Sequence, residues 1–549
     1  MSEKIFIGVA WPYANGTLHL GHIAGAYLPA DIFARFHRMK GNEVLMVSGS
    51  DQHGTPITIR AEQEHTTPAD VVARYHQEFL DSWRKMGISF DLFTRTGTAN
   101  HAETVHDVFL NLLKKGYIYK DTMSQPYCPK DQRYLPDRYV EGTCPFCKFP
   151  IARGDQCDNC GKPMNPAELI GCHCKICGST PVFKDSEHFF LKLSAFQEQL
   201  KEWAQQQTRW RPSVLNFTKR YLNEGLRDRA ITRDIDWGVT VPVAGYENKR
   251  IYVWFEAVIG YLSASKEWAL SHGDAEAWRP FWQEGAKNYY FIGKDNIPFH
   301  TIIWPAMLMG YGGLNLPYDV PANEFLTLEG KQLSTSRNWA VWLPDYLQLY
   351  EPDPLRYYLS INMPETGDAD FSWQEFFRRN NDELVATYGN LVHRVLTFTY
   401  RNFDGSVPQP GELDASSQAL LAKAQATFSQ VDGLIYRCHF REAMRSAFSL
   451  AQEANRYLDT QSPWKKIKVD RQASATALYV AISVISSLKT ILYPFLPFSS
   501  QKLHRLLGYQ GNLMEWKLET PAAGQKLATP EPLFIKLEDK AKVKDTLRS

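Results

Sequence analysis

The fold of this chain is decided by the stretch Trp11-Pro12-Tyr13-Ala14-Asn15-Gly16-Thr17-Leu18-His19-Leu20-Gly21-His22. It directly follows the apolar run 5–10, so a buried strand ends in a loop and then presents His-x-Gly-His where a helix starts. On a helix the two histidines share one face, and the free N–H groups of the helix N-terminus lie beside them. Gly21 carries no Cβ, which lets a flat base or a ribose approach the backbone. The stretch indicates a nucleotide-phosphate site, although two histidines near a loop also occur by chance on surfaces.

The segments around this stretch predict a parallel sheet. A second apolar strand at 44–47 runs into a polar loop that contains Asp51, and helical stretches follow at 24–39 and 69–85. Strands that alternate with helices are typical of an α/β, Rossmann-like domain, in which ligands gather at the carboxyl ends of the strands. Asp51 lies at such an end, or it is a helix N-cap before Pro56. Two later apolar runs, at 251–257 and 289–295, also read as buried strands that lead into polar loops.

Composition sets wide limits on function. The chain has 549 residues, of which 44% are hydrophobic and 22% are charged, which is typical of a globular protein with several domains. A net charge of +1 neither supports nor excludes a nucleic-acid partner, so a surface of that kind would be a local patch. The apolar segment 477–498 contains serines and a lysine, and we expect a buried bundle helix there rather than a membrane span. No secretory signal is visible, and we expect a cytoplasmic location.

Cysteine pairs indicate structural zinc. Cys144-x-x-Cys147 is followed by Cys157-x-x-Cys160, and four thiolates in two such turns suit a tetrahedral zinc ion. A second, weaker set consists of Cys128, Asp131, Cys174 and Cys177, with Cys172 or His173 as competitors for the fourth position. We therefore expect one to two structural zinc ions per chain. A catalytic zinc is not expected, because four protein ligands leave no open position.

Long helical patterns replace the strand signals from about residue 364 and predict an all-α helix-bundle domain. The segment 383–401 carries apolar residues at helical spacing, and Asn390 and Arg394 lie off that stripe. Trp464 is followed by three lysines at 465, 466 and 468. By itself this pattern favours a core tryptophan beside a solvated basic stretch.

The string from Pro12 to His22 resembles the "HIGH" signature region of class I aminoacyl-tRNA synthetases, and closely that of the methionyl-tRNA synthetase family. In that family the histidines stabilise the phosphates of ATP while an amino-acid carboxylate attacks the α-phosphorus, which is catalysis by positioning and electrostatics. The resemblance implies that His19 and His22 are catalytic. It implies ATP contacts at these residues and at Gly21, Gly293, Asp295 and Thr335.

The second class I signature, a "KMSKS" loop, is matched imperfectly by Gly330-Lys331-Gln332-Leu333-Ser334-Thr335-Ser336-Arg337. Aligned on the two serines, Gln332 and Thr335 occupy the places of the two lysines. Lys331 and Arg337 remain on either side, and either can supply the cation that charge on pyrophosphate requires. The two substitutions keep open a rival interpretation as a non-catalytic tRNA-binding paralogue.

The resemblance also implies a methionine pocket. Asp51 would hold the α-ammonium group. Trp11 departs from the leucine often found at its position. Arg233 would also face the active centre. The implied methionine-binding residues are Trp11, Tyr13, Asp51, Val253, Trp254, Ala257, Tyr261, Ile297, His300 and Trp304.

The resemblance extends over nearly the whole chain and implies its division. We expect a Rossmann-like catalytic domain in two halves, at 1–117 and 226–325, separated by a connective insertion with zinc knuckles at 118–225. A signature-loop and stem-contact region at 326–375 and an α-helical anticodon-binding domain at 376–549 would follow. This leaves no room for the large editing domain of the related isoleucyl, valyl and leucyl enzymes, which are the rivals within the class.

The implied reaction uses ATP with Mg2+ as a substrate to convert L-methionine into methionyl adenylate, and then transfers the methionyl group to tRNA(Met). Asn390, Arg394 and Trp464 match the positions that read an unstacked anticodon base by hydrogen bonding and stacking. We expect a monomer without a membrane partner.

Overall fold

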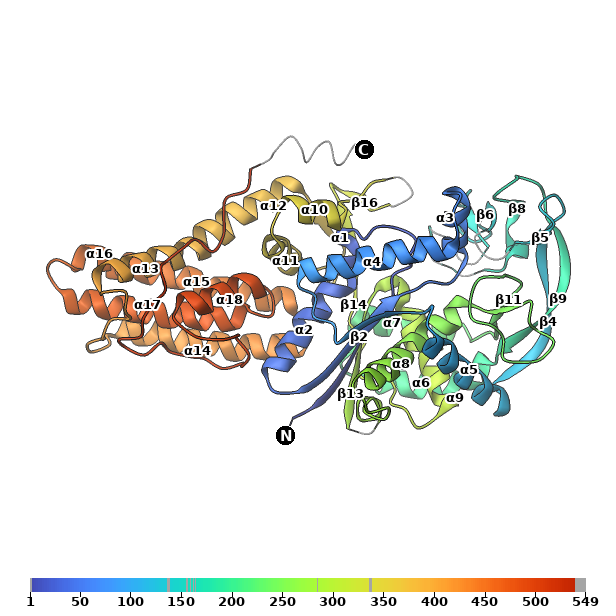
Figure 1. Cartoon of the computed structure of the whole chain (residues 1–549), viewed down its shortest axis with the longest axis horizontal. Helices are drawn as coiled ribbons and strands as arrows, with labels where there is room; N and C mark the ends of the chain where they lie inside the picture. The colour runs from blue at the N-terminus through green and yellow to red at the C-terminus, as the bar shows by residue number, and fades with distance from the viewer. Residues whose placement is uncertain are drawn as a thin grey trace.

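The computed structural model describes residues 2–135, 139–154, 157, 159–160, 162, 164–283, 285–334 and 338–538. The molecule is elongated, with a sheet in its middle, a β-rich insertion at one end and a helix bundle at the other (Figure 1). The arrangement confirms the predicted fold class.

The central sheet has five parallel strands in the order β14-β13-β1-β2-β3. Their bounds are β1 Lys4–Val9, β2 Glu43–Ser50, β3 Leu92–Arg95, β13 Ala286–Gly293 and β14 Ala322–Asn323. β2 and β3 are added on one side of β1, whereas β13 and β14, which come later in the chain, are added on its other side. The strand order therefore reverses between β1 and β13. In open parallel sheets such a switch point forms a crevice at the carboxyl ends of the strands, where ligands bind. The loop with both histidines follows β1 directly.

The two helices predicted between the first strands of the sheet are present. The segment 24–39 forms the π-helix η1 (Ile23–Tyr27) and α2 (Leu28–Met39), and 69–85 lies in α4 (Pro68–Met86). The remaining helices of this part are α1 Leu20–His22, α3 Thr55–Gln63, α5 Ala99–Lys114, α8 Val253–Ser271 and α9 Trp304–Tyr311.

The strand expected at 251–257 is wrong. Only Arg250–Ile251 forms a short strand, β12, which pairs with β11 (Thr232–Arg233), and the rest is the first turn of α8. Most residues of α8 are buried, so its sequence is apolar on almost all sides and lacks the polar stripe of a surface helix. A short apolar run of this kind cannot be told from a buried strand by its periodicity.

The insertion is built on a long antiparallel ribbon. β4 (Ile118–Cys128) pairs with β9 (Val182–Leu191), so that Ile118 lies opposite Leu191. The short strands β5 Arg133–Tyr134 and β10 Arg229–Ala230 extend this sheet. A second small sheet contains β6 Val140–Thr143, β7 Ala152–Arg153 and β8 Ile170–Cys174. The chain returns to the central sheet through α6 Gln197–Gln205 and α7 Pro212–Asn223.

Between the sheet and the bundle lies a small three-stranded sheet. It contains β15 Leu326–Leu328, β16 Lys331–Gln332 and β17 Ala369–Phe371. β17 lies beyond the residue at which the sequence predicts that strands end. The helices of this region are α10 Leu343–Leu349, α11 Pro352–Ile361 and α12 Trp373–Arg379.

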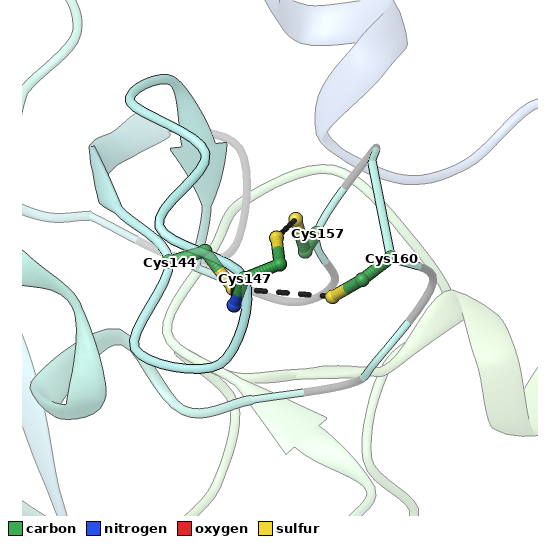
Figure 2. Close-up of side chains that lie close together, drawn as sticks. All are labelled: Cys144, Cys147, Cys157 and Cys160. Carbon is green, nitrogen blue, oxygen red and sulfur yellow. Dashed lines mark hydrogen bonds between the residues drawn. The ribbon is translucent and has the colours of Figure 1, made fainter.

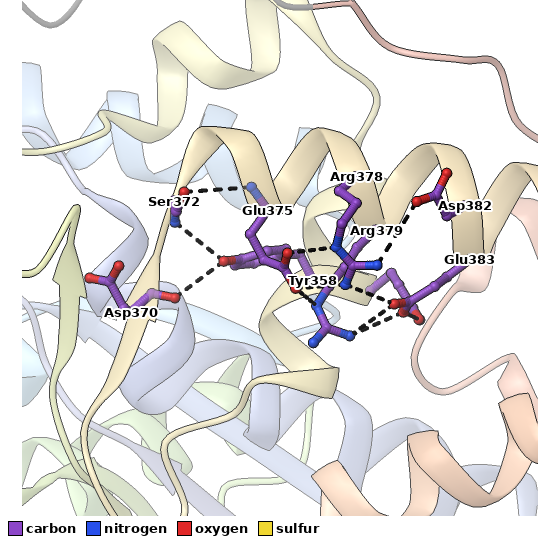
Figure 3. A network of polar contacts seen from close by, with 9 residues as sticks. Tyr358, Asp370, Ser372, Glu375, Arg378, Arg379, Asp382 and Glu383 are labelled. Carbon is purple, nitrogen blue, oxygen red and sulfur yellow. Dashed lines mark hydrogen bonds and ion pairs between the residues drawn. The ribbon is translucent and has the colours of Figure 1, made fainter.

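A polar network fastens β17 to α11 and α12 (Figure 3). The Tyr358 hydroxyl donates to the Asp370 carbonyl at 3.2 Å and accepts the Ser372 N–H at 3.3 Å. One turn further along, Arg378 donates twice to Glu375, at 2.7 Å each.

The bundle confirms the predicted helical domain. After the π-helix η8 (Asn380–Gly389) its helices are α13 Asn390–Asn402, α14 Ala415–Tyr436, α15 Phe440–Gln461, α16 Pro463–Lys466, α17 Arg471–Leu492 and α18 Pro497–Leu506. α17 is long and apolar enough to cross a membrane, but 94% of its apolar window is buried inside the protein. The predicted bundle helix is therefore confirmed, although it ends at Leu492 instead of Phe498. Pro494 and Pro497 follow, and a proline cannot continue the backbone ladder of a helix.

A buried arginine joins the catalytic part to the bundle. Arg356 of α11 is fully buried and donates to Asp31 of α2 at 2.7 Å. It also donates to the carbonyl groups of Pro494 and Phe495 after α17, at 3.0 and 2.7 Å. Against the burial that would raise it, Arg35 and Arg356 hold the pKa of Asp31 at about 2.

We predict that Arg356→Met lowers the free energy of unfolding by at least about 3 kcal/mol, because it removes one charge of a buried pair and strips the donor from buried carbonyl groups. Thermal and urea unfolding would measure the loss. Arg38→Met is the matched control, since Arg38 pairs with Asp91 at 2.7 Å on the partly exposed surface. Equal losses in the two variants would contradict a special role for Arg356.

Candidate active site

Each of the two signature histidines accepts a hydrogen bond from a backbone N–H of the same turn. His19 is the N-cap of α1, and its Nδ1 accepts the N–H of Gly21 at 3.1 Å. The Nδ1 of His22 accepts the N–H of His19, also at 3.1 Å, and the two ring centroids lie 3.9 Å apart. A nitrogen that accepts carries no proton, so each neutral ring has its proton on Nε2. The local backbone thus leaves two Nε2–H donors side by side.

Both histidines are uncharged at neutral pH. Burial lowers the pKa of His22 to about 4. Burial, and then the neighbouring His22, lower the pKa of His19 well below its ordinary value. The pair therefore offers hydrogen-bond donors in a site of low dielectric, where such bonds are stronger than in water.

The second signature region packs on the first. The Leu20 N–H donates to the Val341 carbonyl at 3.1 Å, and the Leu343 N–H donates to the Leu18 carbonyl at 2.8 Å. A Cβ on Gly21 would lie 2.8 Å from Leu333 Cδ1 and 2.9 Å from the His19 ring, so the two signatures are in close contact at this glycine. Lys331 is exposed, with its Nζ 5.1 Å from the centre of the Trp339 ring. The predicted residues Thr335 and Arg337 lie outside the described residues.

Asp51 joins the loops that follow β1 and β2. Its N–H donates to the Pro12 carbonyl, and its carbonyl accepts the Ala14 N–H, both at 2.8 Å. Its carboxylate is buried and accepts the His53 N–H at 3.2 Å. Burial, and then the nearby Glu256, raise the pKa of Asp51 well above its ordinary value. The N-cap alternative is wrong, because Gly54, with φ of +94°, is the N-cap of α3.

The predicted methionine-pocket residues come from four segments that the fold brings together. Val253, Trp254, Ala257 and Tyr261 all lie on α8, where residues three or four apart share a face. The Tyr261 hydroxyl is 2.8 Å from Nε2 of His300, whose Nδ1 lies 2.9 Å from the Asn296 carbonyl. Burial lowers the pKa of His300 to about 4.

Trp11 fits beside Asp51 because two glycines make room for its ring. A Cβ on Gly49 would lie 2.3 Å from the indole, and one on Gly260 would lie 2.8 Å from it. The Trp11 ring meets the edge of Tyr261 with centroids 6.4 Å apart. The larger side chain at this position is thus matched by glycines on β2 and α8.

The loop after β13 reaches the crevice from the other side. β13 ends at Gly293, and Asp295 lies in the short 3-10 helix η6 (Lys294–Asn296). Burial raises the pKa of Asp295. Arg233 packs its guanidinium 3.9 Å from the centre of the Tyr252 ring and donates to the Ala230 carbonyl at 3.0 Å.

The first cysteine set has the geometry of a zinc site. The side chains of Cys144, Cys147, Cys157 and Cys160 point toward one another from two loops (Figure 2). The sulfur atoms of Cys147 and Cys157 are 3.6 Å apart, and those of Cys144 and Cys160 are 3.9 Å apart. Tetrahedral zinc with its usual bonds to sulfur requires about 3.8 Å between sulfurs. These residues therefore fit the ion.

The second set also converges. Cys128 and Cys177 place their sulfur atoms 3.4 Å apart, and Oδ2 of Asp131 lies 3.3 Å from the Cys128 sulfur and 3.2 Å from that of Cys174. All four ligand atoms lie within 4.8 Å of one another. Cys172 and His173, the competitors expected for the fourth position, are outside this group, and Asp131 occupies it. A carboxylate oxygen is an accepted zinc ligand.

The three predicted anticodon residues lie together at the far end of the bundle. Asn390 and Arg394 are one turn apart on α13, and Trp464 lies on α16. The Arg394 guanidinium is 4.4 Å from the centre of the Trp464 ring and 3.3 Å from the side-chain oxygen of Asn455. Trp464 is partly exposed and also packs against the hydrophobic core, so its position agrees with both interpretations from the sequence.

Sequence reasoning missed a buried network behind Asp51. Both oxygens of Glu256, which is fully buried, are used: one lies 2.7 Å from Nδ1 of His53, and the other lies 2.9 Å from Nε2 of His101. A carboxylate is almost never fully buried unless it is paired. The signal was Glu256 itself, the one charged residue in the apolar run 251–264.

Comparisons with known proteins agree with this geometry. Residues 5–396 match the family described as tRNA synthetases class I (M), and residues 407–548 match the anticodon binding domain of methionyl tRNA ligase. The chain is 64% identical to the methionine–tRNA ligase of Dehalococcoides mccartyi, and the match covers 100% of both proteins. It is 53% identical to that of Thermomicrobium roseum, over 98% of this chain and 97% of the relative.

A solved structure shows the same fold. It is Mycobacterium tuberculosis methionyl-tRNA synthetase in complex with methionyl-adenylate, with a TM-score of 0.82 and 27% sequence identity. The similarity covers 97% of this chain and 100% of that structure. With full-length relatives, two matching family regions and the signature loops at the switch point of a parallel sheet, this chain belongs to the methionyl-tRNA synthetases of class I.

Proposed function

We infer that this member of the family is a methionine–tRNA ligase. The oxygen of the methionine carboxylate forms a bond to the α-phosphorus of ATP, the bond to the β-phosphate breaks, and pyrophosphate leaves. A hydroxyl of the terminal ribose of tRNA(Met) then attacks the carbonyl of methionyl adenylate and displaces AMP. The observation that carries this inference is the pair of neutral Nε2–H donors at His19 and His22, at the switch point of the sheet. Preorganised donors of this kind stabilise charge that develops on transferring phosphates.

The ATP subsite is proposed to lie in the crevice between the loops after β1 and β13. Gly21 lies in the turn that carries His19 and His22, where it lets Leu333 of the second signature approach, and Gly293 and Asp295 approach from β13. Mg2+ would accompany ATP as part of the substrate and neutralise its phosphates. Thr335 belongs to the same proposal by its place in the second signature.

Asp51 is proposed to bind the α-ammonium group of methionine. Its carboxylate is buried, and the raised pKa reports the cost of an anion at this place without a cation beside it. An ammonium group that forms an ion pair with Asp51 removes that cost. The thioether would then lie among the aromatic rings, where a flexible sulfur-containing chain packs well. Tyr13, Ile297 and Trp304 complete the proposed pocket, with Arg233 facing the active centre.

Lys331 is proposed to provide a cation for pyrophosphate, together with Arg337. Lys331 lies on β16, two residues before Leu333, and Leu333 packs closely against Gly21 between the two histidines. Gln332 and Thr335 cannot supply the charge that lysines carry at these positions in the family.

The rest of the chain is proposed to support tRNA binding. Two structural zinc ions would hold the knuckles of the insertion at 118–225, and Asn390, Arg394 and Trp464 would read the anticodon. The catalytic halves at 1–117 and 226–325, the stem-contact region at 326–375 and the bundle domain at 376–549 complete this proposal. We further propose that the protein is cytoplasmic, since paired cysteine ligands suit a reducing compartment. We also propose that it acts as a monomer.

We predict that His19→Ala or His22→Ala slows methionine-dependent ATP–pyrophosphate exchange by roughly two orders of magnitude, as the loss of a transition-state donor does. The effect should lie in kcat, with the KM for methionine little changed. His272→Ala is the control, because His272 is exposed on the end of α8. Full exchange activity in both signature variants would contradict the catalytic role, and no exchange by the unaltered protein would overturn the proposed function.

Metal analysis of the purified protein should find one to two equivalents of zinc. Cys144→Ser should remove one equivalent and lower the unfolding temperature of the protein, because metal binding stabilises a small domain directly. Cys438→Ser is the matched control, since Cys438 is buried in the bundle region outside both cysteine sets. Zinc-free protein of normal stability and activity would reject the structural metal.

Trp464→Ala should cost about 1–3 kcal/mol of tRNA recognition, which appears as a lower kcat/KM for tRNA in aminoacylation. ATP–pyrophosphate exchange needs no tRNA and should barely change. Trp464→Phe keeps an aromatic ring and should lose less. Equal losses in both reactions would mean that Trp464 only supports the fold of the bundle.

A further inference from the structure

We propose that Glu256 is a positioning residue that acts through His53 to hold Asp51 ready for the α-ammonium group of methionine. This inference rests on the proposed function and assigns a role to a residue that does not itself touch the substrate. It begins from a carboxylate that is fully buried on α8, behind the pocket face of that helix.

Glu256 is held from two elements that are far apart in the sequence. His53 belongs to the turn before α3, and its Nδ1 is 2.7 Å from one oxygen of Glu256. His101 belongs to α5, and its Nε2 is 2.9 Å from the other oxygen, while its Nδ1 lies 2.8 Å from the Ser263 hydroxyl. An ionised carboxylate accepts hydrogen bonds at both oxygens and thus satisfies both imidazoles.

The connection from Glu256 to Asp51 is short. The N–H of His53 donates to Oδ1 of Asp51 at 3.2 Å, so one residue binds Glu256 by its ring and Asp51 by its backbone. The turn between them is fixed as well, because the Gln52 N–H donates to the Thr96 hydroxyl at 2.9 Å and Trp237 donates to the Gln52 carbonyl at 2.7 Å. The bond from the His53 ring to Glu256 is thus a further anchor for the backbone segment whose N–H binds Asp51.

The negative charge of Glu256, like its hydrogen bonds, is expected to favour binding of the ammonium group at Asp51. The two carboxylates are close enough for Glu256 to raise the pKa of Asp51. Such a pair of buried acids attracts a cation that enters beside Asp51, and the two histidines are the other titratable groups that face Glu256. The ammonium group of methionine is the cation that the proposed reaction brings there. Glu256 should therefore favour ligands with an amine over ligands without one.

The test is Glu256→Gln, measured by methionine-dependent ATP–pyrophosphate exchange with two inhibitors. L-Methioninol keeps the ammonium group, and 4-(methylsulfanyl)butanoate keeps the thioether and the carboxylate but lacks the amine. Because an amide cannot accept hydrogen bonds at both ends, we expect the KM for methionine and the inhibition constant of methioninol to rise about tenfold. The KM for ATP and the inhibition constant of the amine-free compound should stay within about twofold.

A collapsed pocket would give a different pattern, with equal weakening of both inhibitors, and that result would overturn the proposal. An unchanged methioninol constant would overturn it too. Glu267→Gln is the matched control, since Glu267 also lies on α8 but, among the residues that the structure describes, accepts a hydrogen bond only from the Thr94 hydroxyl, at 2.8 Å. It should keep the constants of the unaltered protein.

His53→Gln tests the same connection from the less buried side and decides the matter if Glu256→Gln does not fold. It should produce the same selective loss toward methioninol. The double variant should lose no more than either single variant, because residues that act along one connection are not additive. Additive losses, or a normal methioninol constant in His53→Gln, would overturn the proposal. Exchange by the unaltered protein tests the proposed function separately.

Discussion

The pairing of β1 with a parallel strand on each side is the constraint on which the site depends. Gly8 of β1 lies opposite both Tyr290 of β13 and Val47 of β2, so the sheet continues in both directions from this strand. A Cβ on Gly8 would lie 2.9 Å from the rings of Tyr261 and Tyr290, and the glycine therefore lets α8 pack tightly over the sheet. The loops after β1 and β13 must separate at this point, and the crevice between them receives the histidines from one side and Asp295 from the other.

Burial gives the site its chemistry in two opposite ways. At His19 and His22 burial disfavours the positively charged form and leaves neutral rings as hydrogen-bond donors. The tautomer of each ring is set by the backbone N–H that donates to its Nδ1. At Asp51 burial disfavours the ionised carboxylate, so a cation beside it would be stabilising. In the proposed function, one low-dielectric crevice thus offers neutral donors to phosphates and a carboxylate to an amine. A solvated site with the same residues would make neither distinction as strongly.

The distant parts of the molecule are held by different forces from those of the sheet. The insertion has a small core with four buried cysteines and four more packed against it, and convergence of thiolates on a metal is a direct source of stability for such a domain. The bundle instead buries a continuous apolar helix, α17, and is fixed to the sheet through Arg356. This junction connects the bundle, with its proposed anticodon residues, to the part of the chain that carries the signature loops.

The sequence by itself determined the features that depend on neighbours a few residues apart. The capping pair His19 and His22, the Cys-x-x-Cys turns and the alternation of β1, α2 and β2 are all local patterns, and each is present as predicted. Only the tertiary structure decided that Val253 begins a helix, that Leu333 covers Gly21 and that Glu256 lies between His53 and His101. The physical reason is that the contacts of Glu256 and Leu333 join segments 155 or more positions apart, and that burial of α8 by the whole fold overrides local propensity.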